Sequence, residues 1–311
     1  MTSRYLLELF YQAGAGYVPR AALGENATRL VAELEALGYG VEFHPHRGYR
    51  LLQSPDRLSA DDIQARLRLQ LIGTEILVFE QTTSTNDVVA HLAAAGAREG
   101  LVVFAESQTR GRGRHKRAWA SPHRKGLWFS VLLRPPFPSS RFHRITIAAS
   151  VAVVRALRRQ TAFEPRIKWP NDITLNDRKL AGIITEVEGT AAVLGIGINV
   201  NCSAQDFPPD VAPLATSLAM ESGRRHDRGA LAAAVLCELD NCYRQLLADF
   251  HAIVTEWATN SSTLGRQIIV RVGRRRLEGC ALALDEDGAL LVRRDNGQIE
   301  RLLSGDLEVQ R

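Results

Sequence analysis

The sequence predicts an α+β protein built from three consecutive parts. Three patterns support this: two helical segments and a short hairpin before residue 62, alternating strands and helices from Glu75, and short strands divided by polar turns from Thr263 onward. At 311 residues, 45% of them hydrophobic, the chain is long enough for two or three domains and a substantial core. We place the domains at residues 1–62, 63–260 and 261–311.

The first part has the element order of a winged-helix-like domain. Apolar residues at helical spacing predict helices over 4–13 and 28–37; the second starts at Asn26 or Ala27 and ends at Gly38. The apolar positions 27, 30, 31, 34 and 37 define one face of this second helix. Strands over 41–43 and 49–52 flank the turn HPHRG and predict a hairpin that would serve as the wing. The segment SPDRLSADDIQARL then predicts a linker that enters a short helix.

The remaining elements follow in order along the chain. We expect strands over 76–79, 101–106, 126–133, 166–169, 173–175, 182–187 and 192–200. We expect helices over 85–95, 142–159 and 231–250. From residue 263, short strands separated by VGRRRLEG, DEDG and DNGQ are typical of a small SH3-like β-barrel.

Residues 107–125, SQTRGRGRHKRAWASPHRK, form a loop with seven Lys or Arg side chains and no acid. We expect Gly111 and Gly113 to adopt positive φ and to let the backbone approach a ligand, while the cations bind phosphate or carboxylate. Taken alone, such a run is more often a solvated loop or a nucleic-acid patch. Below, this segment is called the basic loop.

The distribution of charge favours a bound anion. The chain has a net charge of +5, but residues 1–62 sum to −2, and the +7 of the remainder equals the charge of the basic loop. Of the 39 Lys and Arg residues only four are lysines, Lys116, Lys125, Lys168 and Lys179. A general bias toward arginine explains their scarcity but not their clustering, which suggests a place that needs a compact ammonium.

Several classes of protein are disfavoured. No apolar run approaches the roughly 20 residues of a membrane span, and the start MTSRYLLELFYQAG carries an acid within too short an apolar stretch for a signal peptide. We therefore expect a cytoplasmic protein without membrane attachment. The four cysteines form no CxxC pair and have no histidine at ligand spacing, which argues against a zinc site or a disulfide framework.

Four motifs together carry a family resemblance: STN at 84–86, QTRGRGR at 108–114 with Trp119, KWPNDI at 168–173 with RKLAGIITE at 178–186, and GIGINVN at 195–201. In this order and spacing they resemble the biotin protein ligase family and, given the winged-helix segment, its bifunctional ligase and biotin operon repressor branch. The resemblance covers roughly residues 70–311. It implies a central class II synthetase-like α/β domain and a C-terminal barrel that helps to bind ATP and the carrier.

The resemblance implies a reaction in two steps. Biotin and ATP give biotinyl-5'-AMP and pyrophosphate, and a lysine of a biotin carboxyl carrier domain of a biotin-dependent carboxylase then attacks the anhydride. Adenylation crowds a carboxylate against phosphates, so fixed cations and magnesium would offset the repulsion. Ligases of this kind often form a homodimer through the edge of the central sheet.

Site residues are carried over position by position. The resemblance implies that biotin is bound by Ser84, Thr85, Asn86, Gln108, Arg112, Gly113, Arg114 and Lys179. It implies that ATP or the adenylate is bound by Arg114, Arg117, Trp119, Lys168, Asn171 and Asn199. Catalytic roles fall to Arg114, Lys168 and Lys179, and a metal-binding role to Asp172. Hydroxyl and amide side chains suit the uncharged urea of biotin, which needs paired donors and acceptors.

Each assignment has a plainer alternative. Ser84 and Thr85 could cap the helix that follows them, and Asp172 could be a turn residue. Trp119, Trp128 and Trp169 could be core aromatic residues, an interpretation that we favour for Trp128 because it lies within an apolar strand.

The N-terminal part departs from the pattern of a DNA-binding domain. Between Val18 and Thr28 there is space for only one helical turn, PRAAL, and the connector GENA, and the family's usual Ser-Arg start of the recognition helix is missing. The segment is net negative, whereas operator binding depends on neutralising phosphates. We hypothesise a degenerate winged helix with weak or lost DNA binding. The wing residues Arg47 and Arg50 favour the opposite view.

Two other functions remain as alternatives to a ligase. One is a transcriptional repressor that uses biotinyl-AMP as corepressor, with or without ligase activity. The other is a lipoyl or octanoyl transferase on the same fold, against which GRGR, KWPND and the C-terminal barrel argue.

Overall fold

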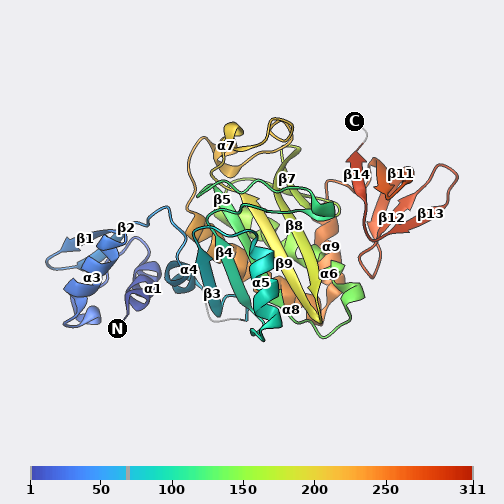
Figure 1. Ribbon diagram of the computed structural model, residues 1–311. Helices are drawn as coiled ribbons and strands as arrows, with labels where there is room; N and C mark the ends of the chain where they lie inside the picture. The colour runs from blue at the N-terminus through green and yellow to red at the C-terminus, as the bar shows by residue number, and fades with distance from the viewer. Residues whose placement is uncertain (1, 68–70, 310–311) are drawn as a thin grey trace.

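The computed structural model describes residues 2–67 and 71–309. They form a small N-terminal unit, a central sheet with helices on both faces, and a C-terminal sheet at the opposite end of the molecule (Figure 1). The predicted α+β class is thereby confirmed. Residues 1, 68–70 and 310–311, which fall within the three predicted parts, lie outside the described residues.

The N-terminal unit packs three helices against a hairpin. Its elements are α1 (Ser3–Ala13), α2 (Arg20–Leu23), α3 (Ala27–Ala36), β1 (Gly40–His44) and β2 (Gly48–Gln53). The predicted helices, the single turn before the second of them, and the hairpin are confirmed. Position 37 is a correction: Leu37 is 56% exposed, because α3 ends at Ala36 and Leu37 follows as its cap.

A linker and a short helix join this unit to the central sheet. Residues 54–59 lead into α4 (Ala60–Arg66), the predicted short helix. The buried carboxylate of Asp62 accepts hydrogen bonds from the Tyr11 and Tyr39 hydroxyls and from Arg66. Because α4 contacts α1 on one side and α8 on the other, it forms the junction between the two bodies (Figure 1).

The central sheet has seven strands in the order β3-β4-β5-β9-β8-β7-β6. Only the β3–β4 pair is parallel. The strands are β3 (Glu75–Phe79), β4 (Leu101–Ala105), β5 (Gly126–Leu133), β6 (Arg166–Lys168), β7 (Asp172–Leu175), β8 (Arg178–Glu188) and β9 (Ala191–Asn199). Every residue of β5 is buried, as expected for a central strand covered on both faces.

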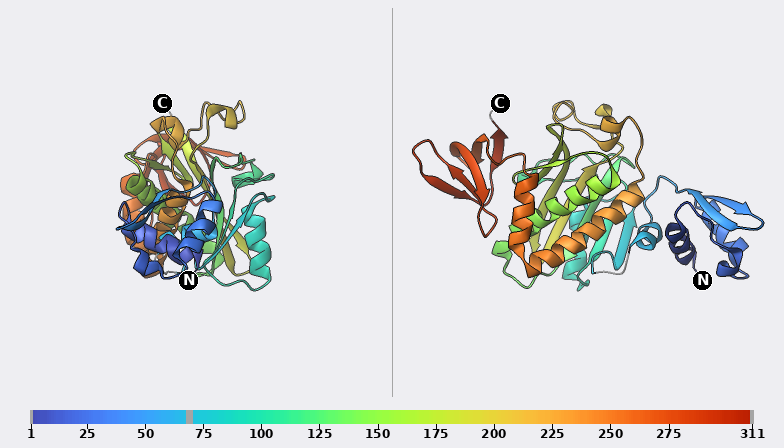
Figure 2. Two further views of the ribbon diagram at one scale, coloured as in Figure 1. Left: turned by 90° about the vertical axis from the view of Figure 1, so that its left-hand side faces the viewer. Right: turned by 180° about the vertical axis from the view of Figure 1, so that it is seen from behind.

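Helices cover both faces of this sheet. One face carries α6 (His143–Gln160), α8 (Arg228–Ala248) and α9 (Phe250–Asn260), which Figure 2 shows side by side from behind. The other carries α5 (Thr85–Ala94), and a short helix, α7 (Leu218–Ser222), lies near the top edge (Figure 1). The sequence prediction of one helix over 231–250 was wrong in extent. Asp249 separates two helices by accepting a hydrogen bond from Ala252 N, which begins α9.

The predicted strand over 182–187 was too short at its beginning. β8 starts at Arg178, because residues 178–182 pair with β7. The extension places Lys179 in a strand, where its position is fixed by neighbours on both sides.

The C-terminal sheet has the order β13-β12-β11-β10-β14 and is antiparallel throughout. Its strands are β10 (Gln267–Val272), β11 (Arg275–Leu284), β12 (Leu290–Arg293), β13 (Ile299–Leu302) and β14 (Asp306–Val309). β14 returns to pair with β10, and this return brings the turn before it back toward the central domain.

None of the helices in residues 2–67 and 71–309 combines the length and apolar character that crossing a membrane requires. No disulfide joins the cysteines at 202, 237, 242 and 280 in the described residues.

Candidate active site

A cavity of about 1320 Å³ lies where the start of α5, the basic loop and strands β6 to β9 meet. Gly305 and the first two residues of β14, Asp306 and Leu307, also line it. These three residues are called the C-terminal turn below. The structure brings every predicted site residue to this cavity: Ser84, Thr85, Asn86, Gln108, Arg112, Gly113, Arg114, Arg117, Trp119, Lys168, Asn171, Asp172, Lys179 and Asn199. Which ligand group each one contacts stays a prediction.

The start of α5 forms an uncharged polar wall. Ser84 holds the N-cap position, yet its side chain makes no capping hydrogen bond. Gln108 Oε1 instead accepts from Thr85 N at 2.8 Å and from the Thr85 hydroxyl at 3.2 Å. Beneath them, the Ser130 hydroxyl donates to Asn86 Oδ1 at 2.5 Å, and its oxygen lies within hydrogen-bond distance of Thr85 Oγ1 at 2.7 Å. The Gln108 side chain of the basic loop therefore fixes the start of α5. The loop and the helix together form one surface of the cavity.

Arg112 is held by acids from outside the loop. Its Nε and Nη2 donate to the two oxygens of Glu186 at 2.9 and 2.8 Å, and its Nη1 lies 2.6 Å from Asp87 Oδ1. Asn86 Nδ2 donates to the same Glu186 at 2.6 Å. Burial works to raise the pKa of Glu186, but the hydrogen bonds from Arg112 and Asn86 outweigh it and leave that pKa below its usual value. Glu186 therefore remains ionised and positions both partners.

Sequence reasoning missed Glu186 as a site residue, although it ends the motif RKLAGIITE. The available signal was an acid after the apolar run of the strand, in a chain whose basic loop has no acid. Ser121 and Ser130, which hold Gln108 and Thr85, gave no such signal.

The expectation of positive φ at Gly111 and Gly113 was wrong. In the basic loop the positive φ values fall on His115 (54°), Lys116 (59°) and Arg124 (55°). Gly111 is nevertheless needed for close approach, because a Cβ there would lie 2.6 Å from the Trp119 carbonyl oxygen. At Gly113 the nearest atom to such a Cβ is 3.8 Å away, so space alone does not require glycine.

Five of the loop's seven cations line the cavity: Arg110, Arg112, Arg114, Lys116 and Arg117. The expectation that all seven serve one anion was therefore too broad. Arg124 instead pairs with Glu80 at 3.0 Å, and Lys125 Nζ lies 3.6 Å from Asp206 Oδ2.

Two of these arginines join the central domain to the C-terminal turn. Arg114 Nη1 donates to Asn171 Oδ1 at 3.3 Å and to the Gly305 carbonyl at 3.1 Å, and Arg117 Nη2 lies 2.7 Å from Asp306 Oδ2. Burial lowers the pKa of Arg114 and exceeds the opposing attraction of nearby carboxylates. A desolvated guanidinium of this kind interacts strongly with an anion that enters the cavity.

Lys179 and Trp119 line the cavity next to each other. Lys179 Nζ lies 2.7 Å from Asp172 Oδ1 and 5.2 Å from the centroid of the Trp119 ring. The indole fits over β9 because a Cβ at Gly197 would lie 2.5 Å from Trp119 Nε1. Trp119 is thus a wall residue, whereas Trp128, as we favoured, is fully buried in the core.

Protein side chains alone do not form a metal site around Asp172 in the described part of the chain. Among the described residues no group of three or more His, Cys, Asp or Glu side chains could hold a metal ion. Magnesium is commonly bound through one or two carboxylates plus substrate phosphates, and Asp172 fits that arrangement as the protein carboxylate.

Comparison with known proteins agrees with this geometry. Residues 78–203 match the Biotin/lipoate A/B protein ligase family, and residues 263–309 match the Biotin protein ligase C terminal domain. The bifunctional ligase/repressor BirA of Bacillus subtilis is 34% identical over 98% of this chain and 97% of its own length. The biotin--[acetyl-CoA-carboxylase] ligase of Mycobacterium tuberculosis is 35% identical over 76% of this chain and 91% of its own length.

A solved structure supports the same assignment. Biotin protein ligase from Aquifex aeolicus in complex with biotin and ATP has a TM-score of 0.68 and 26% identity, and covers 76% of this chain and 99% of its own. Given the match over nearly the whole length of a curated relative, the chain belongs to the biotin protein ligase family.

Proposed function

We propose that this protein is an ATP-dependent, AMP-forming biotin protein ligase. One observation carries the proposal: a single cavity joins an uncharged polar wall at the start of α5 to five cations of the basic loop and to Lys168 and Lys179. Such a cavity matches a ligand that is uncharged at one end and anionic at the other. The Bacillus relative that spans nearly the whole chain is named a bifunctional ligase/repressor, the Mycobacterium relative is named a biotin--[acetyl-CoA-carboxylase] ligase, and the Aquifex structure holds biotin and ATP.

The reaction has two balanced steps. A biotin carboxylate oxygen attacks the α-phosphorus of ATP, and the bond from that phosphorus to the oxygen bridging to the β-phosphate breaks, so pyrophosphate leaves. The amine of a lysine on a biotin carboxyl carrier domain then attacks the acyl carbon, an amide forms, and AMP and a proton leave. Both steps spread negative charge that fixed cations can stabilise.

We base the roles of the residues on the family resemblance, and their shared cavity supports the assignment. Ser84, Thr85 and Asn86, with Gln108, bind the uncharged ring system of biotin, and Arg112 closes that end. Arg114, Lys168 and Lys179 stabilise the carboxylate and the phosphates during transfer. Arg117, Trp119, Asn171 and Asn199 contact the nucleotide, and Gly113 belongs to the groups that bind biotin. Magnesium bound through Asp172 and phosphate oxygens would offset charge on the leaving pyrophosphate.

The flanking parts fit a ligase better than a lipoyl or octanoyl transferase. Residues 263–309 match a C-terminal domain named for biotin protein ligases, and their five-stranded antiparallel sheet supports an SH3-like barrel. We assign residues 1–62 to a winged-helix-like domain, 63–260 to the catalytic domain and 261–311 to the barrel. The cytoplasmic location and the homodimer stay predictions.

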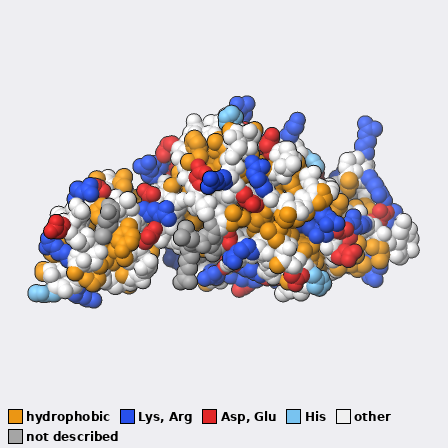
Figure 3. All heavy atoms as spheres, turned by 90° about the horizontal axis from the view of Figure 1, so that it is seen from below, with side chains coloured by type: hydrophobic (Ala, Val, Ile, Leu, Met, Phe, Trp, Pro, Cys, Tyr) orange, Lys and Arg blue, Asp and Glu red, His pale blue; other side chains and the backbone are white. Residues whose placement is uncertain are grey.

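A repressor function is the second candidate, because the Bacillus relative is named a bifunctional ligase/repressor. Contacts in the N-terminal unit argue for weak DNA binding. Arg29 pairs with Glu33 at 2.9 Å, Arg50 with Glu42 at 2.6 Å, and the Arg47 guanidinium lies 4.2 Å from the centroid of the Tyr17 ring. On the face seen in Figure 3, basic and acidic side chains are intermingled over this unit. Arg29 and Arg50 are thus paired with acids, and residues 1–62 are net negative, which argues against strong binding to phosphates.

The ligase proposal predicts transfer of label to a carrier. Incubated with radiolabelled biotin, ATP, magnesium and a biotin carboxyl carrier domain, the protein should label one lysine of the carrier and release AMP and pyrophosphate. Omission of ATP is the control and should abolish labelling. A carrier that stays unlabelled in the complete mixture would contradict the proposal.

Lys179→Arg tests the need for a compact ammonium. The change keeps the charge but replaces a point donor by a planar fork, and a hydrogen bond to a charged group contributes about 1.5–3 kcal/mol, so biotin affinity should fall roughly tenfold or more. Titration calorimetry measures it. Lys125→Arg is the matched control, because that lysine lies in the same sequence window but pairs with Asp206. If Lys179→Arg binds biotin as tightly as wild type, the clustering of the lysines reflects composition alone.

Glu186→Gln removes the charge that holds Arg112. Biotin affinity should fall about tenfold, and Glu256→Gln, which unpairs Arg155 away from the cavity and the basic loop, should leave it unchanged. Because the pKa of Glu186 is lowered, the pairing is present above the usual carboxylate range and is lost only as pH falls below it. The difference between wild type and variant should therefore be constant over about pH 6 to 8. An affinity in Glu186→Gln equal to wild type would refute the positioning role.

The N-terminal unit should bind DNA weakly. In a mobility-shift assay with DNA from upstream of the protein's own gene, we expect no tight complex with or without biotin and ATP. A tight complex that depends on biotin would overturn this view and establish the repressor function.

A further inference from the structure

A buried ion pair lies beside the active site without lining it. Arg228, the first residue of α8, and Glu106, the residue after β4, each have a side chain only 1% exposed. Arg228 Nη1 donates to Glu106 Oε2 at 2.5 Å and Nη2 donates to Oε1 at 3.2 Å. Neither residue lines the cavity, so neither one has a direct role in the proposed reaction.

The pair contacts both ends of the basic loop. Glu106 directly precedes Ser107, the first residue of the loop, and its carbonyl accepts a hydrogen bond from Arg124 N at 3.0 Å. Gly126 directly follows the loop, and its carbonyl accepts from Arg228 Nη1 at 3.2 Å. One guanidinium thus joins the residue before the loop to the residue after it.

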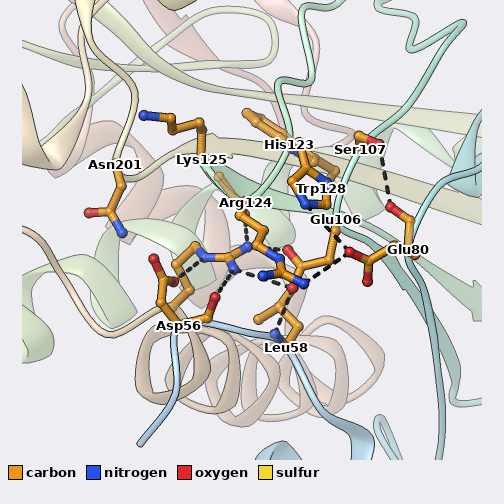
Figure 4. A network of polar contacts seen from close by, with 12 residues as sticks. Asp56, Leu58, Glu80, Glu106, Ser107, His123, Arg124, Lys125, Trp128 and Asn201 are labelled. Carbon is orange, nitrogen blue, oxygen red and sulfur yellow. Dashed lines mark hydrogen bonds and ion pairs between the residues drawn. The ribbon is translucent and has the colours of Figure 1, made fainter. Parts of the chain in front are cut away.

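The linker from the N-terminal unit completes the contacts. Leu58 N donates to Glu106 Oε1 at 2.7 Å, and Asp56 Oδ1 accepts from Arg228 Nε at 2.9 Å. The Asp56 carbonyl accepts from Arg228 Nη2 at 3.3 Å. Figure 4 shows Asp56 and Leu58 of the linker facing Glu106 beside Arg124 and the strand of Trp128.

Such a contact set is costly to maintain unless it is complete. Burying two charges carries a desolvation penalty that only good geometry and further hydrogen bonds repay. Arg228 has five N–H donors and makes five hydrogen bonds, to Glu106, Asp56 and the Gly126 and Asp56 carbonyls. Removing any one partner leaves a buried charge or donor unpaired, so the loop ends and the linker are held together.

We propose that Glu106 and Arg228 are positioning residues for the ligase reaction, which fix both ends of the basic loop and anchor the N-terminal linker on the same pair. The inference rests on the proposed function for its effect on biotin. The loop carries Arg112 and Arg114, whose placement depends on where the loop begins and ends. A small displacement of such groups is enough to cost up to about 100-fold in rate or binding.

The test compares Glu106→Gln and Arg228→Gln with Arg155→Gln. Arg155 pairs with Glu238 and Glu256 between α6, α8 and α9 and lines no part of the cavity. It therefore controls for the general loss of stability that follows the breaking of a half-buried ion pair. In the loop-end variants KM for biotin should rise roughly tenfold or more at temperatures where thermal unfolding shows all variants folded. Arg155→Gln should keep the wild-type KM.

Cleavage by trypsin gives a readout that needs no activity. The loop contains several arginines and two lysines, and proteolysis reports local opening. Without substrates, the loop of the Glu106 and Arg228 variants should be cut faster than that of wild type or Arg155→Gln. If wild type fails to label a carrier but the cleavage difference holds, the ligase proposal fails, while the conclusion that this pair fixes the ends of the loop stands. Equal cleavage, or an unchanged KM in active variants, overturns the inference.

Asp56→Ala tests the part played by the linker, even if the buried variants do not fold. It removes the side-chain contacts of the linker to Arg228 and Arg225 while leaving the pair with Glu106 intact. KM for biotin should rise by about threefold, less than in the loop-end variants. A wild-type KM together with wild-type cleavage would show that the linker has no part in positioning the loop.

Discussion

The organisation of this protein depends on the need to hold the cations of one loop close together. Residues 107–125 carry seven positive side chains and no acid. Unit charges a few ångströms apart repel strongly where water is partly excluded. The acids that offset this repulsion come from elsewhere in the chain: Asp87 on α5, Glu186 on β8, Asp306 on β14, Glu80 after β3 and Asp206. The loop can take its shape only when these elements are assembled around it.

This dependence shapes the proposed chemistry. In the structure Arg112 is paired with two carboxylates, and Lys179 with Asp172. A substrate that brings a carboxylate and phosphates would meet Lys179 already held by Asp172, while Arg112 stays held by Glu186 and Asp87 at the uncharged end. Because the protein's own groups already replace water around the guanidinium groups, little reorganisation is needed as charge develops. The uncharged wall at α5 stays separate, held by Gln108 and Ser130.

The parts at both ends of the chain also contact the loop. The C-terminal turn accepts a hydrogen bond from Arg114 through Gly305 and pairs with Arg117 through Asp306. The N-terminal linker reaches the loop ends through Asp56 and Leu58. Both flanking parts therefore contribute hydrogen bonds that help to hold the basic loop, which lines the cavity, or its ends.

The sequence by itself determined the fold class, the order of nearly all elements and 14 of the residues that line the cavity. It could do so because periodicity reports local burial, and because the motifs STN, GRGR, KWPND and GIGINVN identify a family when they occur together. Local patterns also misled: the predicted helix ran past Asp249 and α9 was not predicted, and the loop glycines suggested positive φ that His115 and Lys116 adopt instead. Tertiary structure alone decided the partners. Glu186, Asp306, Glu106 and Arg228 lie tens to hundreds of residues from the groups that they hold. No local pattern records such a pairing, because it arises only when distant strands and helices pack around one loop.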